Sequence, residues 1–338
     1  MRPVREISSK LYREGKYLLR EAGHKLGFYN NFYRKARGSR ILIYHGICKC
    51  DPTRFNPIFL TQKTFENHLK FYKKHFNVIS LDDYYDQKFS DEKFNICITF
   101  DDGFANNYKY VLPLLEKYQV PAAFFITAIR AAGYDVLWND FIGIVSKYGP
   151  QKLLYKNRPF YKNRFDKYVS AKDGVSLVDK LRKGGFNEKA EMMKLLYDIV
   201  PFKSNKADED YWLQMTTQQI RKLAASPLVT IGSHGYYHND LVNIKISDSA
   251  EELILSKQYI ENVIRKKIKC FAFPYGSYTP EVVTAAKGAG YKQLLATDFQ
   301  NHADRFDTTM RERFTVNPFI STSNQMYATV TRRYENHR

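Results

Sequence analysis

The feature that most constrains this chain is a repeated alternation of short apolar runs and amphipathic helical stretches, which begins near residue 40. Each apolar run has the length of a buried strand, and each stretch between two runs is long enough for a helix. Connections of this kind favour parallel pairing of successive strands. The pattern therefore predicts an α/β fold in which a parallel sheet, open or closed into a barrel, is covered by helices.

The predicted elements follow this alternation along the whole chain. Strands are predicted at 41–46, 78–81, 95–103, 122–127, 228–234, 270–276, 293–297 and 313–316. Helices are predicted at 64–76, 105–118, 217–225, 247–265 and from about 280 onward. The helix at 217–225 is preceded by Thr216, with Gln219 three residues later, which is the pattern of a capping box.

Three segments with different roles are predicted. Residues 1–39 read as a basic amphipathic helical segment, 40–325 as the α/β domain and 326–338 as a C-terminal tail. Within the domain, residues 139–214 are richer in Lys, Asn and Tyr, so we expect an insertion made of helices without strands. The N-terminal segment has two interpretations: a helix packed on the domain, or a helix that docks on an anionic membrane.

Charge and composition exclude several classes. The formal net charge is +18, but no nucleic-acid-binding motif accompanies it, so we predict no nucleic-acid partner. The four cysteines have no metal-binding spacing and are expected to be reduced thiols. No apolar run is long enough for a signal-peptide core or a bilayer span, which predicts a cytoplasmic protein with at most a peripheral contact to an anionic membrane.

Two motifs at strand ends carry the candidate chemistry. Asp101 and Asp102, followed by Gly103, end the predicted strand 95–103, and the carboxyl ends of parallel strands are where α/β folds place their active sites. His234 and His238 follow another strand and are spaced so that both imidazoles can reach one ion. An ordinary Asp-Gly turn and a pair of histidines without a ligand remain the alternatives.

The combination predicts a hydrolytic metal site. Two histidines and one carboxylate supply three protein ligands and leave positions open for water and substrate. The second carboxylate is then free to act as a base, since an ion that activates water beside a base is suited to amide or ester hydrolysis.

Three motifs resemble those of a known family. Thr99-Phe100-Asp101-Asp102-Gly103, the run SHGYYHNDL at 233–241 and the run FAFPYG at 271–276 occur in the order found in the polysaccharide deacetylase (NodB-homology) family, carbohydrate esterase family four. The resemblance covers about residues 40–320. It implies a deformed (β/α)7 barrel, similar to a TIM barrel, and removal of N-acetyl groups from amino sugars. The third motif is similar to the variant found in deacetylases of exopolysaccharides and surface polysaccharides.

The resemblance also implies roles for individual residues. Asp101 corresponds to the general base, and Asp102, His234 and His238 correspond to ligands of a divalent ion, most often zinc, with cobalt, nickel or manganese as alternatives. Tyr275, after Pro274 in the substrate-binding third motif, would donate its backbone N–H to the oxyanion. The implied substrate is an N-acetylated amino sugar.

The sequence departs from the family pattern at two places. Ala272 stands where many members have the arginine that pairs with the catalytic base, and no Leu-x-x-His motif for the general acid is present near the C-terminus. His45, at the end of the first strand, is the first candidate for that acid, and His302 is the second. Trp138 either lines the substrate site, in a Trp-Asn-Asp run similar to a weaker family motif, or is a core aromatic. The departures leave open a catalytically weak or inactive glycan-binding relative.

Overall fold

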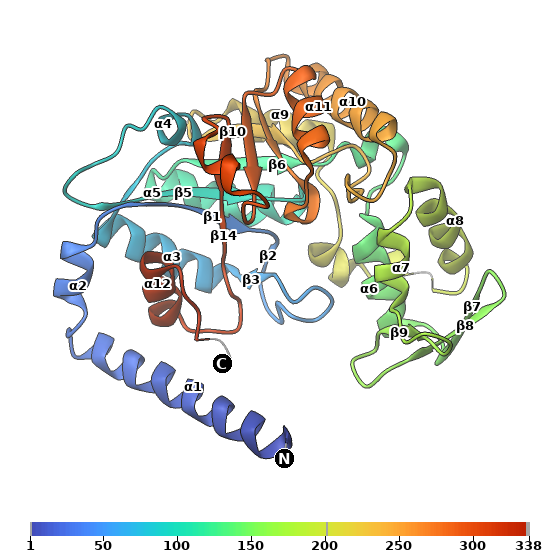
Figure 1. Ribbon diagram of the computed structural model, residues 1–338, viewed down its shortest axis with the longest axis horizontal. Coiled ribbons are helices and arrows are strands. Elements are labelled where there is room, and N and C mark those ends of the chain that lie inside the picture. Colours follow the sequence, from blue (N-terminus) through green and yellow to red (C-terminus); the bar gives the residue numbers. More distant parts are fainter. Residues whose placement is uncertain (1, 201, 336–338) are drawn as a thin grey trace.

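A nine-stranded parallel sheet forms the centre of the molecule (Figure 1). The computed structural model describes residues 2–200 and 202–335. The strand order is β13-β12-β11-β10-β6-β5-β1-β14, and β4 also pairs with β5. The strands are β1 (Ser39–Tyr44), β4 (Phe76–Val78), β5 (Phe94–Phe100), β6 (Ala122–Ile126), β10 (Val229–Ser233), β11 (Cys270–Ala272), β12 (Gln293–Ala296), β13 (Met310–Glu312) and β14 (Phe314–Thr315).

The sheet is nearly closed into a barrel, as the family resemblance implies. β13 pairs with β12 at one end of the sheet, whereas β14 pairs with β1 at the other end. Only Arg313 separates β13 from β14 along the chain, so the two ends of the sheet come together at this residue. The sequence analysis expects a single strand at 313–316 and misses β13, because three residues are too short to show a period.

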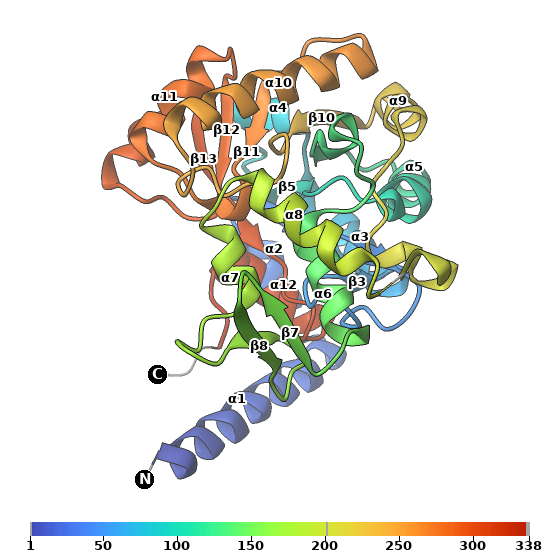
Figure 2. The same cartoon turned by 90° about the vertical axis from the view of Figure 1, so that its right-hand side faces the viewer.

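Helices surround the barrel (Figure 2), and most lie where they are predicted. They are α3 (Gln62–His75), α4 (Leu81–Tyr85), α5 (Leu112–Tyr118), α9 (Thr217–Ala225), α10 (Ile246–Ile264), α11 (Pro280–Gly288) and α12 (Thr322–Thr331). The predicted capping box of α9 is confirmed, since the Thr216 side chain accepts from the Gln219 N–H and the Gln219 side chain accepts from the Thr216 N–H. A π-helical turn (Asn107–Val111) precedes α5.

Both faces of the strands are buried. One large cluster joins Phe100 and Phe124, whose rings stack at 5.0 Å, to the surrounding helices. A smaller cluster that includes Cys97, Ala123 and Phe125 takes the alternate side chains of the same strands and fills the barrel. This explains why the strands read as continuous apolar runs.

Two local predictions need correction. The strand expected at 78–81 lies earlier, as β4, because the Ser80 side chain accepts from the Asp83 N–H and begins α4. The insertion contains strands as well as helices: an antiparallel sheet of β7 (Lys152–Tyr155), β8 (Arg158–Lys162) and β9 (Tyr168–Ser170). It lies among α6 (Trp138–Tyr148), α7 (Leu177–Arg182) and α8 (Phe186–Tyr197), and this region has its own apolar core. These strands are short and half exposed, so their sequence carries no apolar run.

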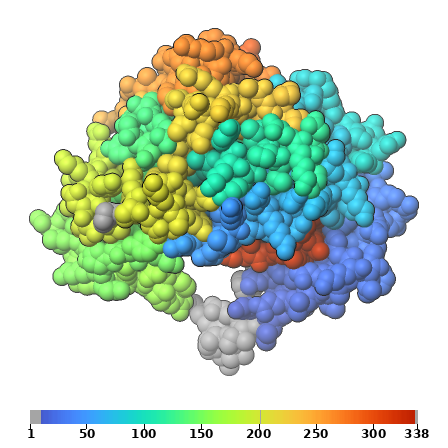
Figure 3. Space-filling model, turned by 180° about the vertical axis from the view of Figure 1, so that it is seen from behind, coloured from blue at the N-terminus to red at the C-terminus, as the bar shows by residue number. Residues whose placement is uncertain are grey.

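The N-terminal and C-terminal helices of the chain contact each other. The helices α1 (Arg2–Lys25) and α2 (Asn30–Lys35) form the predicted N-terminal helical segment, and α1 contacts α12 (Figure 3). The helix α12 extends to Thr331, inside the segment expected to be a tail, and Met326 and Ala328 are buried. The side chains of Val4 and Ile7 and the residues 336–338 lie outside the described part.

Two further observations concern the predicted location and redox state. No helix within the described residues combines the length and the apolar character needed to cross a bilayer. All four cysteines are free, and three of them, Cys48, Cys97 and Cys270, are buried.

The packing inside the barrel can be tested at Gly232 in β10. A Cβ atom there would lie 2.6 Å from the Phe125 ring and 2.7 Å from the Cys270 Sγ. We expect Gly232→Ala to lower the free energy of unfolding by about 1–3 kcal/mol, measured by urea denaturation. Gly288→Ala is the control, because a Cβ at Gly288 meets nothing and the free energy of unfolding should stay equal or rise slightly. Equal midpoints for Gly232→Ala and the wild type would contradict this packing.

Candidate metal centre

The candidate residues gather at the carboxyl edge of the barrel. Asp101 and Asp102 follow β5, His234 follows β10, and Tyr275 lies just after β11. The last residues of β5 and β10 lie only two residues apart along β6, because Phe100 pairs with Phe124 and Ser233 pairs with Ile126. Parallel pairing therefore brings together residues that are far apart in the sequence.

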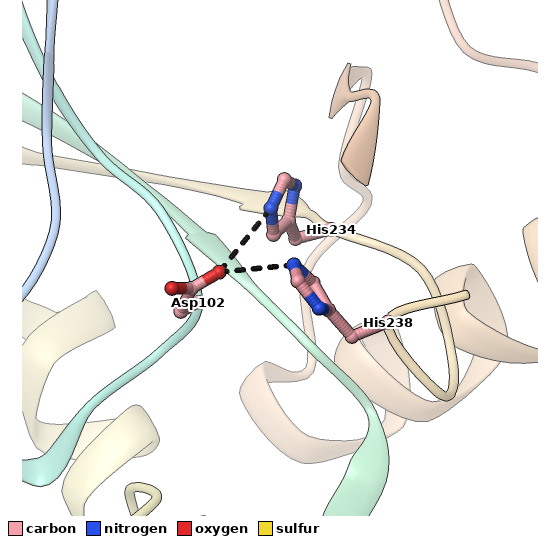
Figure 4. A group of neighbouring side chains, drawn as sticks. All are labelled: Asp102, His234 and His238. Atoms are coloured by element: carbon pink, nitrogen blue, oxygen red, sulfur yellow. Dashed lines mark ion pairs between the residues drawn. The ribbon is translucent and has the colours of Figure 1, made fainter. Parts of the chain in front are cut away.

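Asp102, His234 and His238 converge on a common point (Figure 4). The Asp102 Oδ1 atom lies 3.4 Å from His234 Nε2 and 3.2 Å from His238 Nε2. All three side chains are buried, and their ligand atoms lie within 4.8 Å of one another. The structure thus brings together the three residues that the sequence motifs single out as ligands.

This donor set suits a divalent ion such as zinc. Two ligand atoms that are each about 2.1 Å from a tetrahedral ion are separated by about 3.4 Å, close to the distances between Asp102 and the two histidines. His234 Nδ1 lies 2.8 Å from the Ala272 carbonyl oxygen, and an N–H donated to this acceptor leaves Nε2 free as a ligand. The residues present therefore fit the metal that the motifs imply.

The charges at the site support one another. Burial works to raise the pKa of Asp102, but its hydrogen bonds to His234 and His238 hold the pKa well below its usual value. Burial works to lower the pKa of His234, but Asp101 and Asp102 outweigh it and raise that pKa. The pKa of His238 is lowered by burial, with Asp102 opposing the shift. A buried carboxylate that favours its charged form is an effective cation ligand.

Asp101 is held by Arg313, which the sequence analysis does not identify. The guanidinium donates from Nη1 to Asp101 Oδ1 at 2.7 Å and from Nη2 to Asp101 Oδ2 at 2.8 Å. Burial works to raise the pKa of Asp101, but Arg313 and His234 lower it below its ordinary value. The arginine missing at Ala272 is therefore replaced from the barrel seam. Its only signal in the sequence is a charged residue directly before an apolar run.

Three site residues adopt left-handed backbone conformations. The φ angles are 75° for Asp102, 56° for His238 and 60° for Tyr275. Residues other than glycine rarely adopt such angles, at a cost of about 1–3 kcal/mol each, and they concentrate at functional sites. The loops that follow β5, β10 and β11 are therefore held in place by their surroundings.

The two histidines proposed as the general acid lie in different places, and His45 is the one at this edge of the barrel. His45 is partly buried and interacts electrostatically with both Asp101 and Asp102; burial lowers the pKa of its imidazole and the two carboxylates oppose that shift. The Asn107 side chain donates to the His45 carbonyl oxygen at 2.9 Å and fixes this loop. His302 is exposed on a short 3-10 helix, where its ring contacts Phe306.

Trp138 contacts the loop that carries His238. Its side chain is 0% exposed, and its indole Nε1–H donates to the His238 carbonyl oxygen at 3.1 Å. The structure thus buries the Trp138 ring against the loop that carries His238, and a contact with substrate stays a prediction. Nearby, the buried side chain of Asp140 accepts from Asn56 Nδ2 at 2.9 Å, and burial together with the charge of Asp102 raises the pKa of Asp140 well above its usual value.

Two cations of the insertion hold the same loop. Arg182 Nε donates to the buried Asp240 at 2.6 Å, and its guanidinium lies 4.2 Å from the centre of the Tyr275 ring. Lys189 is fully buried and donates to Asn239, next to His238. The insertion therefore contacts both the segment that carries His238 and Tyr275, the residue expected to supply the oxyanion donor.

The chain matches the sequence profile of the polysaccharide deacetylase family over residues 89–153 and 202–294. The unmatched stretch between these two parts, 154–201, lies inside the insertion. No curated protein matches the chain in a sequence search.

Several solved structures share the fold. IcaB from Ammonifex degensii is 15% identical with a TM-score of 0.54, and the match covers 87% of this chain and 97% of that one. The deacetylase PplD of Streptococcus pyogenes, solved in complex with acetate, is 16% identical with a TM-score of 0.51 over 86% of this chain and 97% of that one. A polysaccharide deacetylase from Bacillus cereus is 17% identical with a TM-score of 0.53 over 86% and 68% of the two chains.

The contact between Trp138 and the loop that carries His238 can be tested by removing the indole hydrogen-bond donor. Trp138→Phe removes the donor to the His238 carbonyl oxygen, and we expect the affinity for zinc or cobalt, measured by titration calorimetry, to fall about tenfold or more. Trp212→Phe is the matched control, because Trp212 is buried in the same apolar cluster but its Nε1–H has no hydrogen-bond partner. Equal affinities for the two variants would contradict this role.

Proposed function

Because the chain belongs to the polysaccharide deacetylase family, we propose that it is a metal-dependent hydrolase that removes the acetyl group from the nitrogen of an amino sugar in a polysaccharide, a glycolipid or a glycan precursor. The observation that carries the proposal is the buried cluster of Asp102, His234 and His238 with a second carboxylate, Asp101, beside it. A ligand set and an adjacent base are the two requirements of metal-assisted amide hydrolysis.

Each residue at the carboxyl edge of the barrel has its own role in the proposed reaction. Asp102, His234 and His238 would hold the ion, whose contribution is to polarise the amide carbonyl and to activate water. Asp101, kept charged by Arg313, takes a proton from the attacking water while the water oxygen bonds to the carbonyl carbon of the amide. The backbone N–H of Tyr275 donates to the oxyanion, and removal of one such donor costs about 3–4 kcal/mol in a well-studied hydrolase.

His45 is the proposed general acid. The C–N bond breaks as the amine nitrogen receives a proton, which leaves acetate and a free amino sugar. His45 lies at the same edge as the candidate base and ligands; burial lowers the pKa of its imidazole, and the charges of Asp102 and Asp101 offset part of that shift. This assignment uses the residue directly after β1 for the role that a C-terminal histidine fills in many relatives.

A catalytically weak glycan-binding relative is the second candidate function. It is favoured by the absence of the C-terminal histidine motif. Ala272, in place of the family's arginine, no longer favours this second candidate, because Arg313 supplies a guanidinium to Asp101.

The two carboxylates are expected to separate ion binding from catalysis. Asp101→Asn should keep the bound ion, measured by elemental analysis of the purified protein, but lower acetate release from N-acetylglucosamine oligosaccharides about 100- to 10,000-fold. Asp102→Asn should lose both the ion and the activity, because it removes a charged ligand. Full activity in either variant would refute the assignment, and a wild type that binds ion and glycan without turnover would favour the second candidate.

Arg313 is expected to act through Asp101. Arg313→Ala should lower kcat about tenfold to a hundredfold with the ion content unchanged, because the base loses its orientation, and added guanidinium should restore part of the activity. The control is Arg311→Ala, two residues away, where the guanidinium bonds to backbone carbonyls of Thr308 and Met310. A loss of kcat that is the same in both variants, or that guanidinium does not restore, would point to a structural effect.

A further inference from the structure

The helix α1 packs on the domain through its polar face. Arg20 donates to Asn324 Oδ1 at 3.0 Å and to Glu335 at 2.7 Å, and its guanidinium lies 4.0 Å from the centre of the Tyr327 ring. Lys16 also donates to Glu335, at 3.2 Å. Polar and charged contacts therefore hold this helix against the C-terminal part of the chain.

The opposite face of α1 is apolar and exposed. Leu11, Gly15, Leu18, Ala22 and Leu26 follow one another at spacings of three or four residues, which places them along one stripe of the helix. The large side chains on and beside this stripe are each between 63% and 75% exposed: Leu11, Tyr12, Leu18, Leu19 and Leu26. A Cβ added at Gly15, in the middle of the stripe, would meet nothing within 4 Å.

This arrangement is the reverse of that in an ordinary surface helix. Such a helix buries its apolar stripe and exposes its charges, whereas α1 buries Arg20 and exposes its leucines. α1 also runs along the outside of the molecule, clear of the barrel for much of its length (Figures 1 and 2). A contiguous exposed apolar stripe of this kind marks a surface for a partner or a membrane.

The positive charge around the apolar stripe favours an anionic partner. Residues 1–40 contain eleven Lys or Arg residues and three Glu residues, and the whole chain carries a formal charge of +18. Lys10 and Lys25 are exposed on α1, and Arg34, Lys35 and Arg37 are exposed just after it. A second copy of this helix would bring the same positive charges together, whereas an anionic lipid surface complements them.

We propose that α1 docks on an anionic lipid bilayer, parallel to its surface, with the leucine stripe at the boundary between headgroups and acyl chains. Such interfacial helices combine an apolar face with flanking cations, and their binding depends on both. The docking would hold the barrel at the membrane surface through a helix that does not cross it. It is independent of the reaction proposed for the metal centre.

The test replaces two exposed leucines in the full-length protein. Leu18→Glu combined with Leu19→Glu should lower partition onto vesicles of equal parts phosphatidylcholine and phosphatidylglycerol, measured by co-sedimentation, about a hundredfold. Leu154→Glu is the control, because Leu154 is 57% exposed on β7, in the insertion, and should leave partition unchanged. Both variants should keep the wild-type melting temperature and acetate release from a soluble substrate.

Two outcomes would overturn the proposal. One is equal partition of the wild type and the double variant, or of the wild type onto vesicles with and without phosphatidylglycerol. The other is a wild type that ignores both kinds of vesicle but forms dimers, seen by light scattering, which the double variant dissociates. That result would assign the stripe to contact between two copies of the chain.

Discussion

Two adjacent carboxylates buried at the end of one strand impose the constraint on which this structure depends. Charged groups that are removed from water must find opposite charges and hydrogen-bond donors, or they destabilise the fold. Asp101 is matched by Arg313 from the seam of the barrel, and Asp102 is matched by the two histidines that follow β10. Because each partner comes from a different part of the chain, the site forms only when the two ends of the sheet come together at Arg313.

The seam of the barrel and the insertion both contribute contacts to the candidate centre at the carboxyl edge of the barrel. The chain passes from β13 to β14 at Arg313, so the residue that completes the sheet also reaches the candidate base. Trp138, directly before the insertion, and Arg182 and Lys189, within it, all contact the loop around His238. Metal ligands depend on such outer contacts for their orientation, so the part of the insertion that the family profile does not match, residues 154–201 with Arg182 and Lys189, supports the site.

Much of the fold was predictable because long buried strands and their helices carry strong periods. The strand β5 is buried at every position, and the capping box of α9 is written in four consecutive residues. The failures have equally local causes. The strands β7, β8 and β13 are short or half exposed, and Ser80 begins a helix inside a run that resembles a strand. Short elements have too few residues for a pattern, so their structure is decided by what they pack against.

The sequence by itself determined the strand and helix alternation and the identity of the four residues at the candidate centre, since motifs at strand ends are local and parallel pairing brings those ends to one edge. Only the tertiary structure decided that Arg313 binds Asp101, that Trp138 donates to the His238 carbonyl oxygen and that the leucines of α1 are exposed. Each of these depends on a contact between segments widely separated in the chain, and the spacing of residues along a chain carries no information about such contacts.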